Sequence, residues 1–109
     1  MPTSRPAPAR EAPATVVAPE PGAETRLAPR TRVLLHNDDV TPMDFVVHVL
    51  VTVFAKPTPD ATRIMREAHL RGLALVDVLP YEQAEWKVQK AVSLARTRKY
   101  PLAFSLEPE

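Results

Sequence analysis

The spacing of hydrophobic positions changes several times along this chain, and each change predicts a new element. Residues 32–36 form a short apolar run that stops at the polar residues 37–39, a pattern typical of a strand followed by a turn. Apolar residues then recur at intervals of three and four, which predicts a first helix that ends before Pro57. Thr41 is expected to be the N-cap of this helix, with Pro42 at its first helical position.

The second half of the chain repeats this alternation. A second helix is predicted with Thr58 as its N-cap and Gly72 as the residue that ends it. Residues 73–79 are rich in leucine and valine and form a stretch too short for a helix, so they predict a buried strand. A third helix is expected over residues 80–97 and a final strand over residues 102–106.

The predicted order is β-α-α-β-α-β. It indicates an α+β sandwich in which three helices cover a three-stranded antiparallel sheet. The folded domain is expected to span residues 31–109. Residues 1–30 hold seven of the 13 prolines together with alanine and scattered charges. Such a segment buries too little apolar surface to offset its ordering entropy, so we expect a disordered tail.

Composition excludes several classes of function. Fourteen Lys and Arg residues against 13 Asp and Glu residues give a net charge of +1, too small a field to indicate nucleic acid or anionic lipid as a partner. The absence of cysteine excludes disulfides, a thiol nucleophile and thiolate zinc sites. No apolar run approaches the ~20 residues that span a bilayer, and the start lacks a signal pattern. We therefore expect a cytoplasmic protein with no membrane partner.

The densest polar cluster runs from His36 to Thr41, where a strand end leads into a helix start. A loop held between two rigid elements can present acceptors in fixed directions, but Asn and Asp before a helix also serve simply as turn formers. His69 follows Met65 by four residues, so the two side chains share a helix face. A histidine in this position can equally be a packed or solvent-facing residue.

Taken together, these motifs resemble the ClpS family, the bacterial and plastid adaptors of Clp proteases in N-degron degradation. The resemblance runs from about Thr31 to Leu106 without an obvious gap. The residues that carry it are Asn37-Asp38-Asp39, Thr41-Pro42-Met43, Phe45-Val46, Met65, His69, Gly72 and Pro101-Leu102.

This resemblance implies an adaptor that performs no covalent chemistry and needs no cofactor or metal. Its substrates would be N-degron proteins that begin with a free Phe, Leu, Tyr or Trp. The residues similar to those that bind the α-amino group and first peptide unit are Asn37, Asp38, Asp39, Thr41 and His69. Those similar to the hydrophobic pocket lining are Leu35, Met43, Val46, Met65, Ala68 and Leu102.

The resemblance also implies a protein partner, the N-terminal domain of a ClpA- or ClpC-like AAA+ unfoldase. Glu82 and Lys87 match the docking positions of the family, although they can also be ordinary solvated helix charges. The tail would assist delivery. The chain departs from the usual family pattern at the pocket, where Ala68 is smaller than the usual branched residue, and a smaller wall predicts room for Trp or Tyr.

Two other interpretations stay open at the level of sequence. The ClpS fold is shared with the carboxy-terminal domain of the ribosomal stalk protein, so a binding module without N-degron recognition is one alternative. The other is a small hydrolase or metal enzyme that uses histidines and carboxylates. Its candidate residues are His36, Asp38, Asp39 and His69.

Overall fold

The computed structural model describes residues 30–109. Its elements are β2 (Arg30–His36), α2 (Met43–Thr52), α3 (Thr58–Arg71), β3 (Leu73–Pro80), α4 (Tyr81–Thr97) and β4 (Ala103–Pro108). This is the predicted β-α-α-β-α-β order, so the α+β fold class is confirmed. The tail predicted for residues 1–30 lies outside the described residues except for Arg30, which is part of the first strand.

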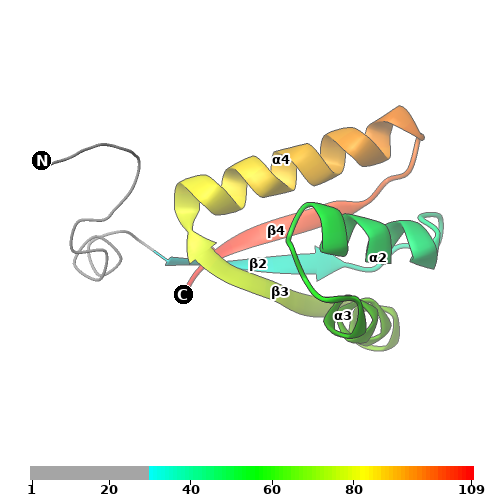
Figure 1. Cartoon of the computed structure of the whole chain (residues 1–109), viewed down its shortest axis with the longest axis horizontal. Coiled ribbons are helices and arrows are strands. Elements are labelled where there is room, and N and C mark those ends of the chain that lie inside the picture. Colours follow the sequence, from blue (N-terminus) through cyan, green and yellow to red (C-terminus); the bar gives the residue numbers. More distant parts are fainter. Residues whose placement is uncertain (1–29) are drawn as a thin grey trace, which may run out of the picture.

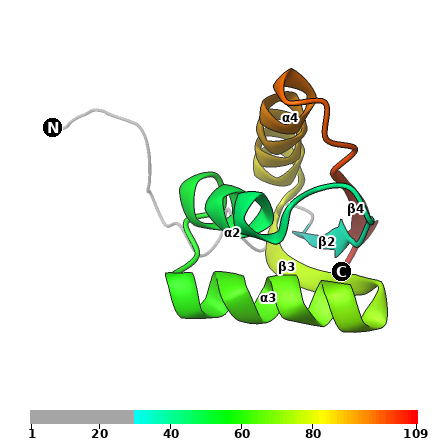
Figure 2. The same ribbon diagram turned by 90° about the vertical axis from the view of Figure 1, so that its right-hand side faces the viewer.

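β2 is the central strand of the sheet and pairs antiparallel with β3 on one side and β4 on the other. The three helices lie together on one side of this sheet (Figures 1 and 2). Because side chains alternate along a strand, Val33 and Leu35 enter the core beneath the helices. Leu34 and His36 belong to the opposite face, which no helix of residues 30–109 covers.

The core lies between the sheet and the helices. α4 contacts all three strands, α3 packs against β3, and α2 packs against α3. Ala84, Ala91 and Ala95 of α4 are fully buried, and such small side chains allow the helix to approach the sheet closely. Larger side chains fill the space around α2 and α3, among them Leu50, Phe54 and Ile64.

Both predicted helix caps are wrong by one residue. The N-cap of α2 is Pro42, not Thr41, and the carbonyl oxygen of Pro42 accepts the N–H groups of Phe45 and Val46 at 3.1 Å. The Thr41 hydroxyl makes no capping hydrogen bond to α2; it donates to the carboxylate of Asp38. α3 likewise has Pro57 as its N-cap, with Thr58 already helical. In both cases a proline with an extended ψ directly precedes the first helical residue.

The strand after α3 is only partly the buried strand that was predicted. Leu73 and Leu75 of β3 are 40% and 43% exposed, because they lie on the sheet face away from the helices. Gly72 ends α3 in the left-handed conformation with φ of 85°, which confirms the predicted stop. Among residues 30–109 the structure has no helix long and apolar enough to cross a membrane.

Candidate functional site

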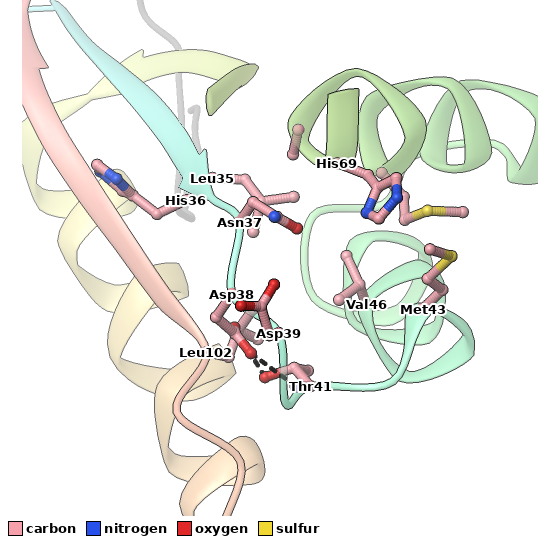
Figure 3. Close-up of a pocket in the computed structure, with 12 residues that line it drawn as sticks. Leu35, His36, Asn37, Asp38, Asp39, Thr41, Met43, Val46, His69 and Leu102 are labelled. Carbon is pink, nitrogen blue, oxygen red and sulfur yellow. Dashed lines mark hydrogen bonds between the residues drawn. The ribbon is translucent and has the colours of Figure 1, made fainter. Parts of the chain in front are cut away.

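A cavity of about 170 Å³ opens where the end of β2, the start of α2 and the end of α3 meet (Figure 3). It is lined by the five residues predicted for the α-amino group and the six predicted for the hydrophobic pocket, together with His36. The full lining is Leu35, His36, Asn37, Asp38, Asp39, Thr41, Met43, Val46, Met65, Ala68, His69 and Leu102. The fold thus brings one sequence cluster and several distant residues to a single place.

The inner part of this cavity is apolar. Leu35, Ala68 and Leu102 are each 2% exposed or less, and Val46 is 8% exposed. Met43, in the first turn of α2, is 48% exposed and stands at the mouth. The cavity therefore has a rigid apolar interior and one long, adaptable thioether side chain at its entrance.

Asp38 organises the loop between β2 and α2. Its carboxylate accepts hydrogen bonds from the N–H of Val40 at 2.8 Å, the N–H of Thr41 at 2.6 Å and the hydroxyl of Thr41 at 2.9 Å. Burial alone would raise the pKa of Asp38, but the hydrogen bonds from Thr41 and Val40 together lower it below its ordinary value. The carboxylate of Asp38 is therefore engaged in holding the loop.

Three other polar groups face the mouth of the cavity. Asn37, Asp39 and His69 are exposed, and their side chains come from two sides, Asn37 and Asp39 from the loop and His69 from α3 (Figure 3). Within residues 30–109 their side chains make no hydrogen bond or ion pair with another residue. An amide oxygen, a carboxylate and an imidazole nitrogen are thus free to accept hydrogen bonds from one cationic donor.

The loop and the helix that carry these acceptors are tied together by the backbone. The N–H of Asn37 donates to the carbonyl oxygen of Gly72 at 3.1 Å, and the N–H of Gly72 donates to the carbonyl oxygen of Ala68 at 2.7 Å. The first of these bonds extends the β2–β3 ladder by one residue beyond the pair His36 and Leu73. The sequence predicts that Gly72 ends the helix, but it contains no signal for this link.

His36 does not take part in the polar cluster. Its imidazole points away from the cavity (Figure 3), and its Nε2 lies 2.8 Å from the hydroxyl oxygen of Ser105 on β4. Strand alternation already indicates this, because Leu35 points inward. The four residues of the hydrolase or metal alternative therefore do not converge. Across residues 30–109 no group of three or more His, Cys, Asp or Glu residues is arranged to hold a metal ion.

The two predicted docking residues lie away from this cavity, on α4. Glu82 is exposed in the first turn of the helix, and Lys87 is half-buried. Between them Trp86 is 59% exposed, with the ammonium group of Lys90 lying 5.2 Å from its ring centroid. No residue of α4 lines the cavity, so a partner on the outer face of this helix would leave the mouth accessible.

The chain is similar in sequence to known proteins. The family model for the ATP-dependent Clp protease adaptor protein ClpS matches residues 26–105. The ClpS adapter of Desulfatibacillum aliphaticivorans is 47% identical over 90 residues, which are 83% of this chain and 86% of the relative. The ClpS adapter of Acetivibrio thermocellus is 42% identical over 95 residues, 87% and 96% of the two chains. Both relatives are Clp protease adapters, which favours the adaptor interpretation over a ribosomal module or an enzyme.

A solved structure gives the same relationship. It is that of Agrobacterium tumefaciens ClpS2 bound to L-phenylalaninamide, which is 39% identical to this chain with a TM-score of 0.73. The match covers 75% of this chain and 99% of that chain. The resemblance inferred from the sequence motifs is therefore confirmed at the level of the family and the fold.

Proposed function

Because the chain belongs to the ClpS family of ATP-dependent Clp protease adaptors, we propose that it captures proteins with a free, bulky hydrophobic first residue and delivers them to a Clp AAA+ unfoldase for degradation. As an adaptor, it is not an enzyme. The observation that supports the proposed substrate class is one cavity that combines an apolar interior with three unengaged acceptors at its mouth. A free amino-terminal residue with a large apolar side chain is complementary to this cavity, because its side chain matches the apolar interior and its amino group matches the acceptors.

The α-amino group is a small cation with several donors, and Asn37, Asp39 and His69 are its proposed acceptors. Asp39 supplies the charge, because the carboxylate of Asp38 is already engaged by the loop. Asn37 offers its amide oxygen, and His69 accepts through an unprotonated ring nitrogen. An acetylated terminus has lost the charge and donors, so it would leave these acceptors without a partner.

Thr41 has a narrower role than the sequence alone allowed. Its hydroxyl proton and its backbone N–H both go to Asp38, so its remaining capacity toward a ligand is that of an acceptor through the hydroxyl lone pairs. We assign it the first peptide N–H of the substrate. Asp38 then contributes indirectly, because it fixes the orientation of this hydroxyl group.

The cavity size fits the proposed side chains. Its volume of about 170 Å³ is close to the ~150 Å³ of an engineered apolar cavity that binds benzene. Burying a Phe or Leu side chain contributes roughly 1.5–3 kcal/mol. L-phenylalaninamide, the ligand of Agrobacterium tumefaciens ClpS2, joins such a ring to a free amino group. The buried, small Ala68 supports the proposal that larger rings such as Tyr and Trp also enter.

Delivery requires a second surface. We assign the N-terminal domain of a ClpA- or ClpC-like unfoldase to the outer face of α4 around Glu82 and Lys87, and a delivery role to the tail before Arg30. The cytoplasm is the proposed location, in agreement with a chain that has no cysteine. A variant that lacks the tail should still bind peptides and the unfoldase but support slower substrate degradation; full-rate degradation would refute the tail's role.

The substrate proposal is tested by titrating peptides that differ only at their amino terminus. Peptides that begin with Phe, Leu, Tyr or Trp should bind, a matched peptide that begins with Ser should bind much more weakly, and acetylation of the Phe peptide should abolish most of the affinity. Equal affinity for the free and acetylated Phe peptides would overturn the proposed recognition of the α-amino group.

A further inference from the structure

The acceptors of the proposed site belong to two separate elements, and their relative position needs a physical cause. Asn37 lies just beyond β2, whereas His69 lies in the last turn of α3. Both residues are exposed. Next to these two residues, the hydrogen bond from the Asn37 N–H to the Gly72 carbonyl oxygen joins the end of β2 to the end of α3, as the last bond of the β2–β3 ladder.

Gly72 makes this connection through an unusual backbone conformation. Its φ of 85° and ψ of −13° lie in the left-handed region, which residues with a Cβ adopt reluctantly. In this conformation its N–H closes α3 on Ala68, a wall of the cavity, while its carbonyl oxygen faces Asn37. A single residue thus joins a wall residue of the cavity to an acceptor at its mouth.

We propose that Gly72 is a positioning residue for α-amino recognition, because its left-handed conformation holds Asn37 at the correct place relative to His69. The proposal rests on the proposed function and adds a residue that touches no ligand. It concerns the amino group specifically. The apolar interior, formed by residues packed in the core such as Leu35 and Leu102, does not depend on this hydrogen bond.

Substitutions at Gly72 test conformation with little interference from packing, because a Cβ built there meets no atom within 4 Å. Alanine disfavours the left-handed region by roughly 5- to 30-fold, and the hydrogen bonds that hold the residue there are worth a factor of a few each. These effects are comparable, so a substantial fraction of Gly72→Ala molecules should adopt a second backbone conformation at residue 72, without the hydrogen bond to Asn37. Affinity for the amino group then falls in proportion to the fraction of molecules that keep the wild-type conformation.

The experiment compares two ligands that share a benzyl side chain and a primary amide, L-phenylalaninamide and L-phenyllactamide, whose hydroxyl group replaces the amino group. The wild type should prefer the amine. Gly72→Ala should lower this preference about twofold or more, and Gly72→Asn should leave it unchanged, since asparagine tolerates the left-handed region. In Gly72→Ala the amide hydrogen of Asn37 should also exchange faster with solvent.

Thermal unfolding separates positioning from stability. Ala84→Gly in α4 is the matched control, because a glycine inside a helix destabilises the protein far from the cavity; it should keep the wild-type amine preference. If Gly72→Ala unfolds at a lower temperature but retains the full preference for the amine, Gly72 only terminates α3 and the proposal is wrong. If the wild type itself shows no preference for the amine, the proposed function fails instead.

Discussion

The hydroxyl group of Thr41 donates a hydrogen bond to the carboxylate of Asp38 at 2.9 Å, and the backbone N–H of Thr41 donates to the other oxygen of the same carboxylate at 2.6 Å. This contact distinguishes two adjacent aspartates that are chemically identical in the sequence. Asp38 is turned toward its own loop, whereas Asp39 is left exposed at the mouth of the cavity. The stability of the fold should therefore depend on the carboxylate of Asp38, and direct contact with the substrate on that of Asp39.

The first prediction separates the two aspartates by substitution with asparagine. Asp38→Asn removes the charge that accepts three hydrogen bonds and should lower the free energy of unfolding by roughly 1–2 kcal/mol. Asp39→Asn should change it by less than about 0.5 kcal/mol but weaken binding of a Phe peptide about tenfold or more, since it removes a charge-assisted hydrogen bond. Denaturant unfolding and peptide titration measure the two effects. The reverse pattern would show that the roles are exchanged.

The second prediction concerns stability in acid. The folded state lowers the pKa of Asp38 below its ordinary value of 3.8, so its stabilising contribution is fully present above about pH 3.8 and is lost as the pH falls through the lower folded value. The difference in free energy of unfolding between wild type and Asp38→Asn should therefore be constant from about pH 7 to pH 5 and shrink toward zero in stronger acid. A difference that stays the same when the pH is lowered well below 3.8 would contradict the assigned hydrogen bonds.

The third prediction concerns His69 and the pH dependence of binding. Protonation converts the accepting nitrogen of His69 into a donor and places a positive charge beside the cationic amino group. Affinity for a Phe peptide should therefore fall when acid protonates this side chain. His69→Gln should bind more weakly with a flat profile. His36→Gln is the control, because its side chain faces the other side of the sheet, and it should retain the wild-type pH dependence.

Much of this site follows from sequence because its residues lie at element boundaries that strong local signals mark. Prolines, Gly72 and the polar run after β2 fix where strands and helices end, and the family motif supplies the residues that meet there. The absence of a cap at Thr41 could not be predicted, because only the folded loop geometry determines whether this side chain faces the helix N-terminus or Asp38.

The limits elsewhere have similar causes. A run of leucine and valine predicts a strand but does not state whether one or both faces are covered, and Leu73 and Leu75 lie on the open face. The link between Asn37 and Gly72 joins residues 35 positions apart through backbone atoms. Side-chain identity carries no signal for it beyond the glycine itself.

The fourth prediction concerns the size limits of the cavity. Met43 is half-exposed at the mouth, so Met43→Ala should leave stability nearly unchanged while it admits peptides that begin with Ile or Val, whose branched Cβ the thioether side chain would obstruct. Ala68 is buried against the cavity, so Ala68→Val should weaken a Trp peptide more than a Leu peptide. Affinities across a set of first residues test both; no gain for Ile peptides in Met43→Ala would show that Met43 does not exclude branched first residues.

The fifth prediction concerns the outer face of α4, where Trp86 lies between Glu82 and Lys87. Trp86 is the only tryptophan of the chain, so 5-fluorotryptophan incorporated into the adaptor gives one fluorine signal at this face. The signal should shift when the N-terminal domain of the unfoldase is added, and stay unchanged when a Phe peptide fills the cavity, since no residue of α4 lines it.

Exposed tryptophans that become buried in an interface often contribute 2 kcal/mol or more. Trp86→Ala should therefore weaken unfoldase binding by about 30-fold and leave peptide affinity unchanged. Leu94→Ala, a control at an apolar residue two turns farther along α4 that is 38% exposed, should behave like the wild type. Unfoldase binding that leaves the fluorine signal and the Trp86→Ala affinity unaltered would place the docking surface elsewhere.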